Sequence, residues 1–506
     1  MTHPNEHKQN RAERSNVFPF VASTGNKTPE AATPAELCLV LAGTMTIGGS
    51  DDRAANQPLG RVSIDTREIA SGEIFWALSG PRFDGNRFID DAIRRGASGI
   101  VTSLSPEEIS ADTLPPGVWV VHVRDTAVAL DRWAEYRRRQ FSGRAIGVTG
   151  SVGKTTARQM IDAVLSMRGT GSASPKNYNN RIGVPVSMTS IRPDHSYTVL
   201  ELGASAEGEI GQLARIARPN VGVITRIGDA HLGGYGSRIG IVRTKLELLQ
   251  SLPSDGVAVL GDDPWLRSMA PSVCPCPILW VGEERHCTFC VERTELVDGR
   301  LLMEVDGCRF QLPVWGRHHI WSALPAIAIG RLHGISDREI AHSLEAFTPP
   351  PQRCEVISVG SMTVINDSYN ASPQAVEAAL VLLGEFDCTG RRIVVLGDMA
   401  NLGPETVALH RRAGAHSVVR GHADYLIAVG RFSRHTIAGA RAVGLSESQT
   451  AAYKTLDEAM THIGQSVQSN DVTLVKGSRV MAMERVVEHL RDYLSGRRYS
   501  ETSRAA

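Results

Sequence analysis

The sequence lacks any apolar stretch close to the roughly 20 residues that are needed to span a bilayer. Residues 1–30 are polar apart from the mildly apolar segment 17–22, so they do not resemble a secretory signal peptide. Eight cysteines among 506 residues are too few for a disulfide framework. These absences predict a cytoplasmic protein that does not bind a membrane.

An excess of either sign of charge is also missing, since Lys+Arg and Asp+Glu number 54 each. A protein held to nucleic acid by charge needs a basic surplus, so the balance argues against a nucleic-acid partner. The 42% hydrophobic and 21% charged residues are ordinary for a globular protein. At about 150 residues per domain, the length predicts roughly three domains.

Four of the cysteines lie close together in the sequence, as Cys274 and Cys276 and then Cys287 and Cys290, with His286 beside the second pair. Zinc favours paired thiolates, and a structural zinc site is one interpretation. The spacing of the first pair is unusual for zinc. A reduced set without a ligand is the alternative, and both remain open at this point.

Short β-rich segments alternate with helical patterns along most of the chain. Strands are predicted at residues 145–148, 197–201 and 221–225, and again at 363–366, 392–396, 425–429 and 472–475. Such alternation is typical of α/β proteins with mostly parallel sheets. We expect a disordered tail over 1–34, a small mixed α/β domain over 35–130, a central domain over 140–347, and a C-terminal Rossmann-like doubly wound domain over 348–497. A proline run at 349–351 is a plausible hinge, and the arginine-rich segment 132–139 is expected to be a solvated helix face.

The sharpest local signal is a glycine-rich segment that follows a predicted strand and opens a predicted helix. Backbone N–H groups of such a loop can surround a polyphosphate at the positive end of the helix. Lys154 would reach the outer phosphates and Thr155 could ligate Mg²⁺. The strict phosphate-loop spacing would require glycine where Val148 stands. We predict an ATP-binding loop and a central P-loop ATPase-like domain from Gly150, Ser151, Val152, Gly153, Lys154, Thr155 and Thr156.

Two polar residues follow neighbouring strands, at the edge where open α/β sheets bind ligands. Glu201 ends one predicted strand, and His231 lies in the loop after the next one. Each alone would more often be an ordinary strand-end or loop residue. Beside a phosphate loop, however, a carboxylate and an imidazole are suitable ligands for a divalent ion.

Lys245 interrupts an apolar row of the helix predicted at residues 238–252. Its row contains Ile241, Leu248 and Leu252 at helical spacing. A lysine that extends its amine to solvent would account for the pattern, and a functional buried amine is the alternative.

Taken together, these segments resemble the Mur ligases, and most of all the members that add D-alanyl-D-alanine to UDP-N-acetylmuramoyl-tripeptide. The resemblance covers nearly the whole chain from about Ile64 onward. Besides the phosphate loop, it rests on residues 65–67, 177–185, 228–237, 367–373, 396–403 and 476–479.

The resemblance implies an ATP-dependent ligase that forms a C–N bond in peptidoglycan synthesis, and thereby supports the cell wall, cell shape and cell division. A carboxylate would attack ATP, and the amine of D-Ala-D-Ala would displace phosphate from the acyl phosphate. It implies two Mg²⁺ ions held by Thr155, Glu201, His231 and a carbamoylated Lys245, with Lys154, His231 and Lys245 as catalytic residues. The chain would act as a monomer. The implied substrate-binding residues are Asp65, Thr66, Arg67, Asn177, Asn179, Asn180, Asp367, Tyr369, Asn370, Lys476 and Arg479, and ATP would also contact Ser322 and Arg353.

This sequence departs from the family pattern at several positions. The family usually has asparagine where His319 and Ser322 stand, and the second of these reads adenine; serine lacks the paired donor and acceptor of an amide. Gln352 replaces a usual glycine, Asn366 a usual aspartate, and Gly233 a common acidic residue.

Two other functions remain open from the sequence. One is another ligase of the same superfamily, of the folylpolyglutamate or cyanophycin type, although residues 65–67 speak against the folate type. The other is a nucleotide-gated binding protein that hydrolyses ATP slowly as a switch. Phosphate release that does not depend on an amine would favour the switch.

Overall fold

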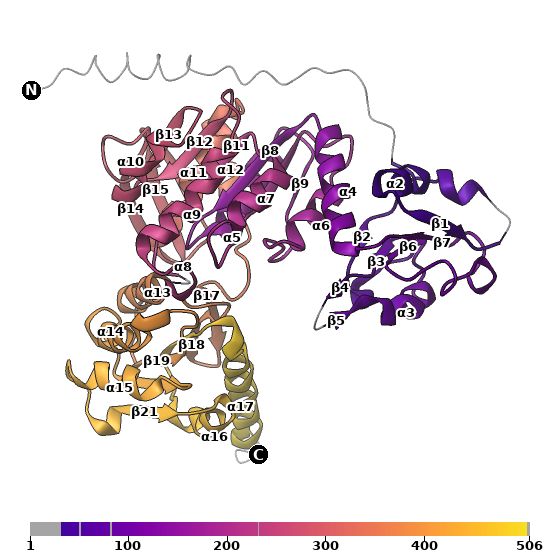
Figure 1. Cartoon of the computed structure of the whole chain (residues 1–506). Helices are drawn as coiled ribbons and strands as arrows, with labels where there is room; N and C mark the ends of the chain where they lie inside the picture. The colour runs from indigo at the N-terminus through magenta and orange to yellow at the C-terminus, as the bar shows by residue number, and fades with distance from the viewer. Residues whose placement is uncertain (1–31, 50–51, 81–82, 231, 503–506) are drawn as a thin grey trace, which may run out of the picture.

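The computed structural model describes residues 32–49, 52–80, 83–230 and 232–502, which form three bodies, each around its own larger sheet (Figure 1). This architecture confirms the predicted three-domain α/β fold. The expected tail lies outside the described residues up to residue 31. Ordered structure then begins before residue 35, because the Thr33 side chain caps helix α2 (Pro34–Leu41). None of the described helices is both long enough and apolar enough to cross a membrane.

The N-terminal body is a five-stranded sheet with strand order β1-β7-β6-β3-β2, in which only the β1–β7 pair is antiparallel. Buried tryptophans on β3, β7 and α4, among them Trp76 and Trp133, fill its core. Its elements are β1 (Thr44–Ile47), β2 (Val62–Ser63), β3 (Ile74–Trp76), the hairpin β4 (Ser79–Gly80) and β5 (Phe83–Asp84), α3 (Ile89–Arg94), β6 (Gly99–Thr102), β7 (Trp119–His122) and α4 (Thr126–Gln140).

The central body has a nine-stranded sheet in the order β16-β15-β14-β13-β12-β11-β8-β10-β9. Strands β8 to β14 run parallel, and β14, β15 and β16 continue as an antiparallel meander. The strands are β8 (Arg144–Thr149), β9 (Gly171–Ala173), β10 (Tyr197–Glu201), β11 (Val221–Ile224), β12 (Val257–Gly261), β13 (Ile278–Gly282), β14 (Phe289–Val297), β15 (Arg300–Val305) and β16 (Cys308–Leu312).

Helices cover both faces of the central sheet, which explains why its inner strands are uniformly apolar. One face packs against α5 (Lys154–Leu165), α11 (Ile320–Leu332) and α12 (Asp337–Glu345). The other packs against α6 (Gly183–Thr189), α7 (Glu209–Ala217), α9 (Arg238–Gln250) and α10 (Pro264–Met269). The short α8 (Leu232–Tyr235) leads from the sheet edge into α9.

The C-terminal body is a six-stranded sheet with order β17-β18-β22-β19-β20-β21, parallel except for the edge pair β17–β18. Two hydrophobic clusters, one on each face, confirm the doubly wound prediction. Its elements are β17 (Glu355–Val359), β18 (Met362–Asp367), α13 (Pro373–Glu385), β19 (Arg392–Gly397), α14 (Thr406–Val419), β20 (Tyr425–Val429), α15 (Ser433–Arg441), β21 (Thr450–Tyr453), α16 (Leu456–Ser466), β22 (Val472–Lys476) and α17 (Glu484–Thr502).

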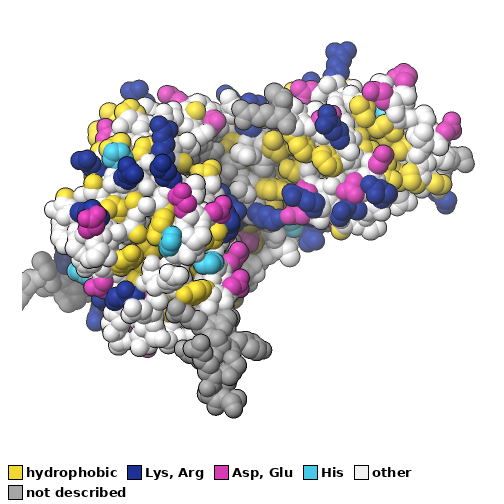
Figure 2. Space-filling view, turned by 90° about the horizontal axis from the view of Figure 1, so that it is seen from below, with side chains coloured by type: hydrophobic (Ala, Val, Ile, Leu, Met, Phe, Trp, Pro, Cys, Tyr) yellow, Lys and Arg dark blue, Asp and Glu magenta, His cyan; other side chains and the backbone are white. Residues whose placement is uncertain are grey.

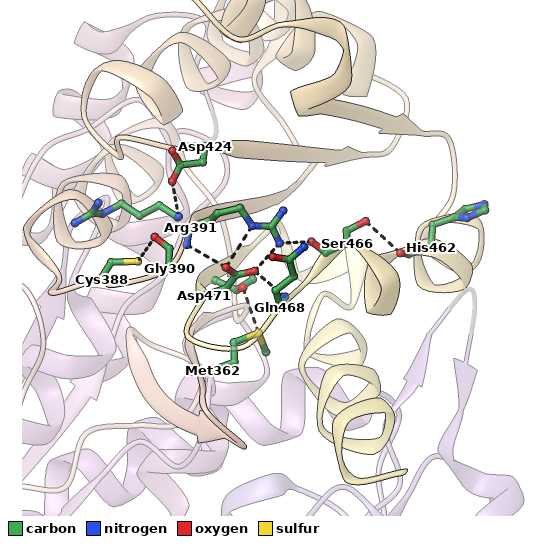
Figure 3. Close-up of polar contacts among 11 residues, drawn as sticks. Met362, Cys388, Gly390, Arg391, Asp424, His462, Ser466, Gln468 and Asp471 are labelled. Carbon is green, nitrogen blue, oxygen red and sulfur yellow. Dashed lines mark hydrogen bonds and ion pairs between the residues drawn. The ribbon is translucent and has the colours of Figure 1, made fainter. Parts of the chain in front are cut away.

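A buried carboxylate ties together the amino ends of β19 and β22 (Figure 3). Asp471 accepts hydrogen bonds from the backbone N–H of Arg391 at 3.0 Å and of Gln468 at 2.7 Å. The Arg391 guanidinium bonds the same carboxylate at 2.7 Å and the Ser466 carbonyl at 2.9 Å. Because this end of the sheet is opposite the ligand-binding edge, the network is structural.

One local expectation was only partly right. Arg132 and Arg139 of α4 are exposed as expected, but Arg137 donates to the Ile191 carbonyl, and Arg138 donates to the Ala217 carbonyl at 2.8 Å. Arg137 and Arg138 therefore fasten α4 to the central body.

Candidate active site

The phosphate loop lies between β8 and α5, in the middle of the central sheet. Gly150 has φ +146° and Gly153 has φ +86°, conformations that favour glycine. A Cβ on Gly150 would lie 2.1 Å from the Thr225 hydroxyl oxygen, so the β11 end leaves no room for a side chain there. The Thr225 hydroxyl donates to the Val152 carbonyl at 2.6 Å, and this contact fixes the loop to the neighbouring strand.

Two basic side chains converge on this loop. Lys154 Nζ donates to the Gly150 carbonyl at 2.8 Å, and burial lowers the pKa of its amine. Arg353, which follows the proline run, donates from Nη2 to the Thr155 hydroxyl at 3.1 Å. Its guanidinium also stacks on the Tyr369 ring, 4.3 Å from the centroid. Arg353 therefore joins the phosphate loop to the C-terminal body.

Glu201 ends β10 and is 2% exposed. Its Oε1 accepts from the Asn179 amide at 2.8 Å, while its Oε2 has no hydrogen-bond partner among the residues that the structure describes. Arg158, equally buried, approaches Oε2 only to 3.8 Å. A buried carboxylate oxygen without a partner is costly, and a divalent cation would satisfy it. The residues present thus fit a metal ion.

Lys245 lies in α9 and is 3% exposed, which excludes the alternative of an amine that extends to solvent and leaves the buried amine. Its Nζ contacts the Tyr235 hydroxyl at 3.4 Å. Burial, with a smaller contribution from the positive charge of Lys154, lowers the pKa of Lys245 to about 7. Near neutral pH, a large fraction of this amine is therefore unprotonated and nucleophilic.

The C-terminal body brings a second charged group to the same region. The amine of Lys476, at the end of β22, is buried, pairs with the Asp367 carboxylate and donates to the Asn370 carbonyl at 2.9 Å. Arg479 extends outward and pairs with Glu484 at 2.6 Å. The carboxyl ends of β18 and β22 thus face the carboxyl ends of β8 and β10.

A cavity of about 670 Å³ lies between these two edges. Figure 2 shows acidic and basic side chains interspersed over the face seen from below. The sequence-predicted residues that line the cavity are Ser151, Val152, Gly153, Lys154, Thr155, Thr156, Asn179, Asn180, Glu201, Ser322, Arg353, Asp367, Tyr369, Asn370, Lys476 and Arg479.

Other predicted residues are not in the lining. Gly150 shapes the loop but does not line the cavity. Lys245 lies within α9 and does not line the cavity either. His231 lies outside the described residues. Asn177 does not line the cavity, although it precedes Asn179 by two residues. Asp65, Thr66 and Arg67 form a separate turn in the N-terminal body, where the Asp65 side chain caps the turn and pairs with Arg67 at 2.5 Å.

The turn of residues 65–67 is nevertheless connected to the central body. Glu68 pairs with Lys176, which directly precedes Asn177. The Arg67 guanidinium lowers the pKa of Asp65 to about 2, so this carboxylate stays charged. The link joins two of the predicted substrate-binding segments.

The positions that depart from the family pattern have identifiable contacts. The Ser322 hydroxyl donates to the Gly153 carbonyl at 3.3 Å and so supports the phosphate loop. The amide of Asn366 donates to Glu355 at 3.0 Å, which an aspartate could not do. Gln352 has φ +60°, a left-handed conformation that accounts for the usual glycine. His319 is buried at the cavity, and its Nδ1 has no partner.

A contact between the bodies closes one side of the cavity. Gln374 of α13 donates to the Asp229 carboxylate at 2.6 Å and accepts from the Asp229 N–H at 2.8 Å. Next to it, a Cβ on Gly233 would lie 2.8 Å from the backbone nitrogen of Gly403. An acidic side chain at position 233 would push these two backbone segments apart, which explains why this sequence has glycine where the family commonly has an acidic residue.

Sequence reasoning missed several residues of the site, because each depends on a contact between distant segments. Gln374 is one residue beyond a recognised segment, and Arg158 looks like an ordinary helical arginine. Arg226 lines the cavity with its guanidinium over the Trp321 ring, 5.0 Å from the centroid. The proximity of Gln374 to residues 367–373 was the one signal that could have identified it.

A phosphate-binding loop at the ligand-binding edge of a parallel sheet, facing a second α/β body across one cavity, defines a multidomain nucleotide-dependent enzyme. Comparison with known families narrows this class. Residues 148–330 match the Mur ligase middle domain, and residues 352–479 match the Mur ligase, glutamate ligase domain. The chain belongs to the Mur ligase family.

Curated relatives specify the branch of the family that the chain resembles. UDP-N-acetylmuramoyl-tripeptide–D-alanyl-D-alanine ligase of Bacillus subtilis (strain 168) is 32% identical over 433 residues, which cover 85% of this chain and 92% of the relative. The Escherichia coli (strain K12) protein of the same name is 32% identical over 449 residues, covering 87% and 95%.

Solved structures agree with these relatives. A crystal structure of MurF from Acinetobacter baumannii superposes with a TM-score of 0.76 at 28% identity, covering 92% of this chain and 100% of that chain. MurF ligase from Thermotoga maritima, solved in complex with ADP, gives 0.72 at 26% identity, covering 88% and 100%. A folylpolyglutamate synthase from Mycobacterium tuberculosis, at 16% identity, shares the fold alone.

Proposed function

We propose that this protein is an ATP-dependent ligase that joins D-alanyl-D-alanine to UDP-N-acetylmuramoyl-tripeptide during peptidoglycan synthesis. The observation that carries the proposal is the shared cavity, which the phosphate loop and Glu201 line from one body and Asp367, Asn370 and Lys476 from another. An enzyme that activates one substrate with ATP and delivers a second to it requires this arrangement.

The tripeptide carboxylate attacks the γ-phosphorus of ATP, which gives an acyl phosphate and ADP. The amine of the dipeptide then attacks the acyl carbon, loses a proton, and expels phosphate as the amide forms. Lys154 and the loop N–H groups stabilise charge on the transferring phosphoryl group, as electrostatics and positioning dominate such transfers. Arg353 keeps the loop and the C-terminal body together while both steps occur.

Thr155, Glu201 and His231 would hold magnesium ions, which neutralise phosphate charge when they are bound. Asn179 holds the Glu201 carboxylate so that its second oxygen stays available. Lys245, with an amine that loses its proton near pH 7, is suited to react with CO₂ and become an anionic carbamate. That change would turn a costly buried cation into an acceptor for a metal or its water.

The three bodies divide the substrates among them. Residues 35–130, through Asp65, Thr66 and Arg67, would bind the UDP-sugar peptide, and the Lys176–Glu68 pair would guide it toward Asn177 and Asn180. Residues 140–347 bind ATP. Residues 348–497 bind the incoming dipeptide through Tyr369, Asn370 and Arg479. A monomer in the cytoplasm is sufficient for this chemistry.

Phosphate release with a panel of amines tests the function. With ATP and UDP-N-acetylmuramoyl-tripeptide present, D-Ala-D-Ala should stimulate release strongly, and L-Ala-L-Ala or single D-Ala much less. Equal stimulation by L-Glu would identify a sister ligase instead. Release that no amine stimulates would favour a nucleotide switch.

A further inference from the structure

Outside the active-site cavity, one group of three side chains among the described residues could hold a metal ion: Asp262, His286 and Cys287. One donor atom from each lies within 4.8 Å of the other two. His286 Nε2 is 3.1 Å from Asp262 Oδ2. The set offers one nitrogen, one oxygen and one sulfur.

The fold brings these donors together from two segments. Asp262 directly follows β12, and the other two lie in the loop between β13 and β14. At the end of β13, Gly282 leaves the space they need: a Cβ there would lie 2.7 Å from the Asp262 Cβ and 3.1 Å from the Cys287 sulfur. The donors therefore converge at the same edge of the sheet as the phosphate loop.

A positive charge already occupies this position. The Arg267 guanidinium pairs with Asp262, and its Nη2 lies 3.7 Å from the Cys287 sulfur. It also stacks on the Trp280 ring at 4.4 Å from the centroid. The arginine side chain is 31% exposed, so it can turn toward solvent without disturbing the core.

We propose that Asp262, His286 and Cys287 form a binding site for one Zn²⁺ ion. The ion would displace the Arg267 guanidinium, and the Cys287 thiol would release its proton to solvent as the Zn–S bond forms. Zinc accepts this mixed donor set, and three protein ligands leave a fourth position for water. The bound ion would tie the β13–β14 loop to the end of β12.

The other cysteines do not belong to this site, which corrects the grouping of four that the sequence suggested. Cys274 and Cys276 precede β13, with their sulfurs 3.6 Å apart, whereas Cys287 follows that strand. A five-residue strand separates the ends by about 15 Å. The Cys290 thiol donates to the Glu283 carbonyl at 3.4 Å.

Titration of the untagged full-length protein with Co²⁺ tests the site. Thiolate ligation gives an intense near-ultraviolet charge-transfer band, which should saturate at one equivalent and disappear when Zn²⁺ is added. Cys287→Ser should abolish the band, whereas the double variant Cys274→Ser/Cys276→Ser should keep it. Zn²⁺ should also raise the Tm of the wild type but not that of Cys287→Ser.

Two further variants keep the proposal testable if Cys287→Ser fails to fold. His286→Gln changes a half-exposed side chain, and it should weaken Co²⁺ binding by about 10–100-fold. Arg267→Met should tighten binding by a similar factor, because it removes the competing cation. The absence of a band in the wild type, a band that persists in Cys287→Ser, or unchanged affinity in both further variants would overturn the site.

Discussion

Burial changes the chemistry of Lys245, since its pKa falls from 10.5 to about 7. Between these two pH values the unfolded chain holds a proton that the folded chain has lost, so the free energy of unfolding rises with pH. Below pH 7 the Lys245 amine is charged in both the folded and the unfolded chain. The destabilisation that results from burying this charge is therefore largest at low pH. The adjacent cation Lys154 adds to that cost, while Glu209 and Glu247 offset part of it.

We therefore expect Lys245→Met to raise the Tm in CO₂-free buffer, and to raise it more at pH 6 than at pH 9. Differential scanning calorimetry across this range measures the effect. Lys454→Met, at an exposed position, is the matched control and should show no such trend. A gain for Lys245→Met that grows with pH would contradict the cause assigned to the pKa shift.

Lys154→Ala should lower ligation by roughly 10²-fold or more, because an alkyl stub cannot meet the charge on the transferring phosphoryl group. The fold should persist, since within the described part of the chain the amine bonds only carbonyls of its own loop. Steady-state phosphate release and the far-ultraviolet circular dichroism spectrum measure the two effects. Turnover close to that of the wild type would remove Lys154 from the phosphate site.

At the residue scale, the sequence predicted what short motifs encode and missed what distant contacts create. The phosphate loop could be found because glycines, Lys154 and Thr155 are adjacent in the chain. The second role of Ser322, as a support for Gly153, could not, because 169 residues separate the two. For Lys245, the apolar row indicated burial, but the choice between burial and solvent contact depended on the packing around Tyr235.

At the element scale, three of the inner parallel strands of the central sheet were predicted, since residues buried on both faces form continuous apolar runs, whereas β12 and β13 were missed. The predicted strands 145–148, 197–201 and 221–225 correspond to β8, β10 and β11. The meander β14–β16 was missed. Strand β14 has one buried residue, and β15 alternates between buried and partly exposed residues, so the apolar pattern is weak and hard to distinguish from loops.

Asp471→Ala should reduce the free energy of unfolding by about 3 kcal/mol, because it leaves two N–H donors and a partly buried guanidinium without their acceptor. Urea unfolding followed by fluorescence measures the loss. Asp457→Ala, which removes an exposed partner of Arg485, is the control and should change stability by less than about 1 kcal/mol. Equal effects would show that the buried network adds no more stability than an exposed ion pair.

At the scale of the whole molecule, the Gln374–Asp229 contact holds the C-terminal body against the ATP-binding body. Gln374→Ala removes two hydrogen bonds, one of them to a carboxylate, so we expect turnover to fall about tenfold. Gln374→Glu should cause a larger loss, since it sets two carboxylates against each other. Kinetics and small-angle X-ray scattering measure turnover and the radius of gyration, and no change in either quantity for Gln374→Glu would exclude a role in closure.

Because Gly233 and Gly403 are in contact, the size of the side chain at position 233 sets how closely the central and C-terminal bodies can approach each other. The two main chains already touch, so atoms added at this point would push the bodies apart, and the hinge that the sequence predicts at residues 349–351 would let the C-terminal body swing away. A series with alanine, valine and leucine at this position would act as spacers of increasing thickness. It would hold the enzyme at successive openings and relate the width of the cavity directly to the rate of ligation.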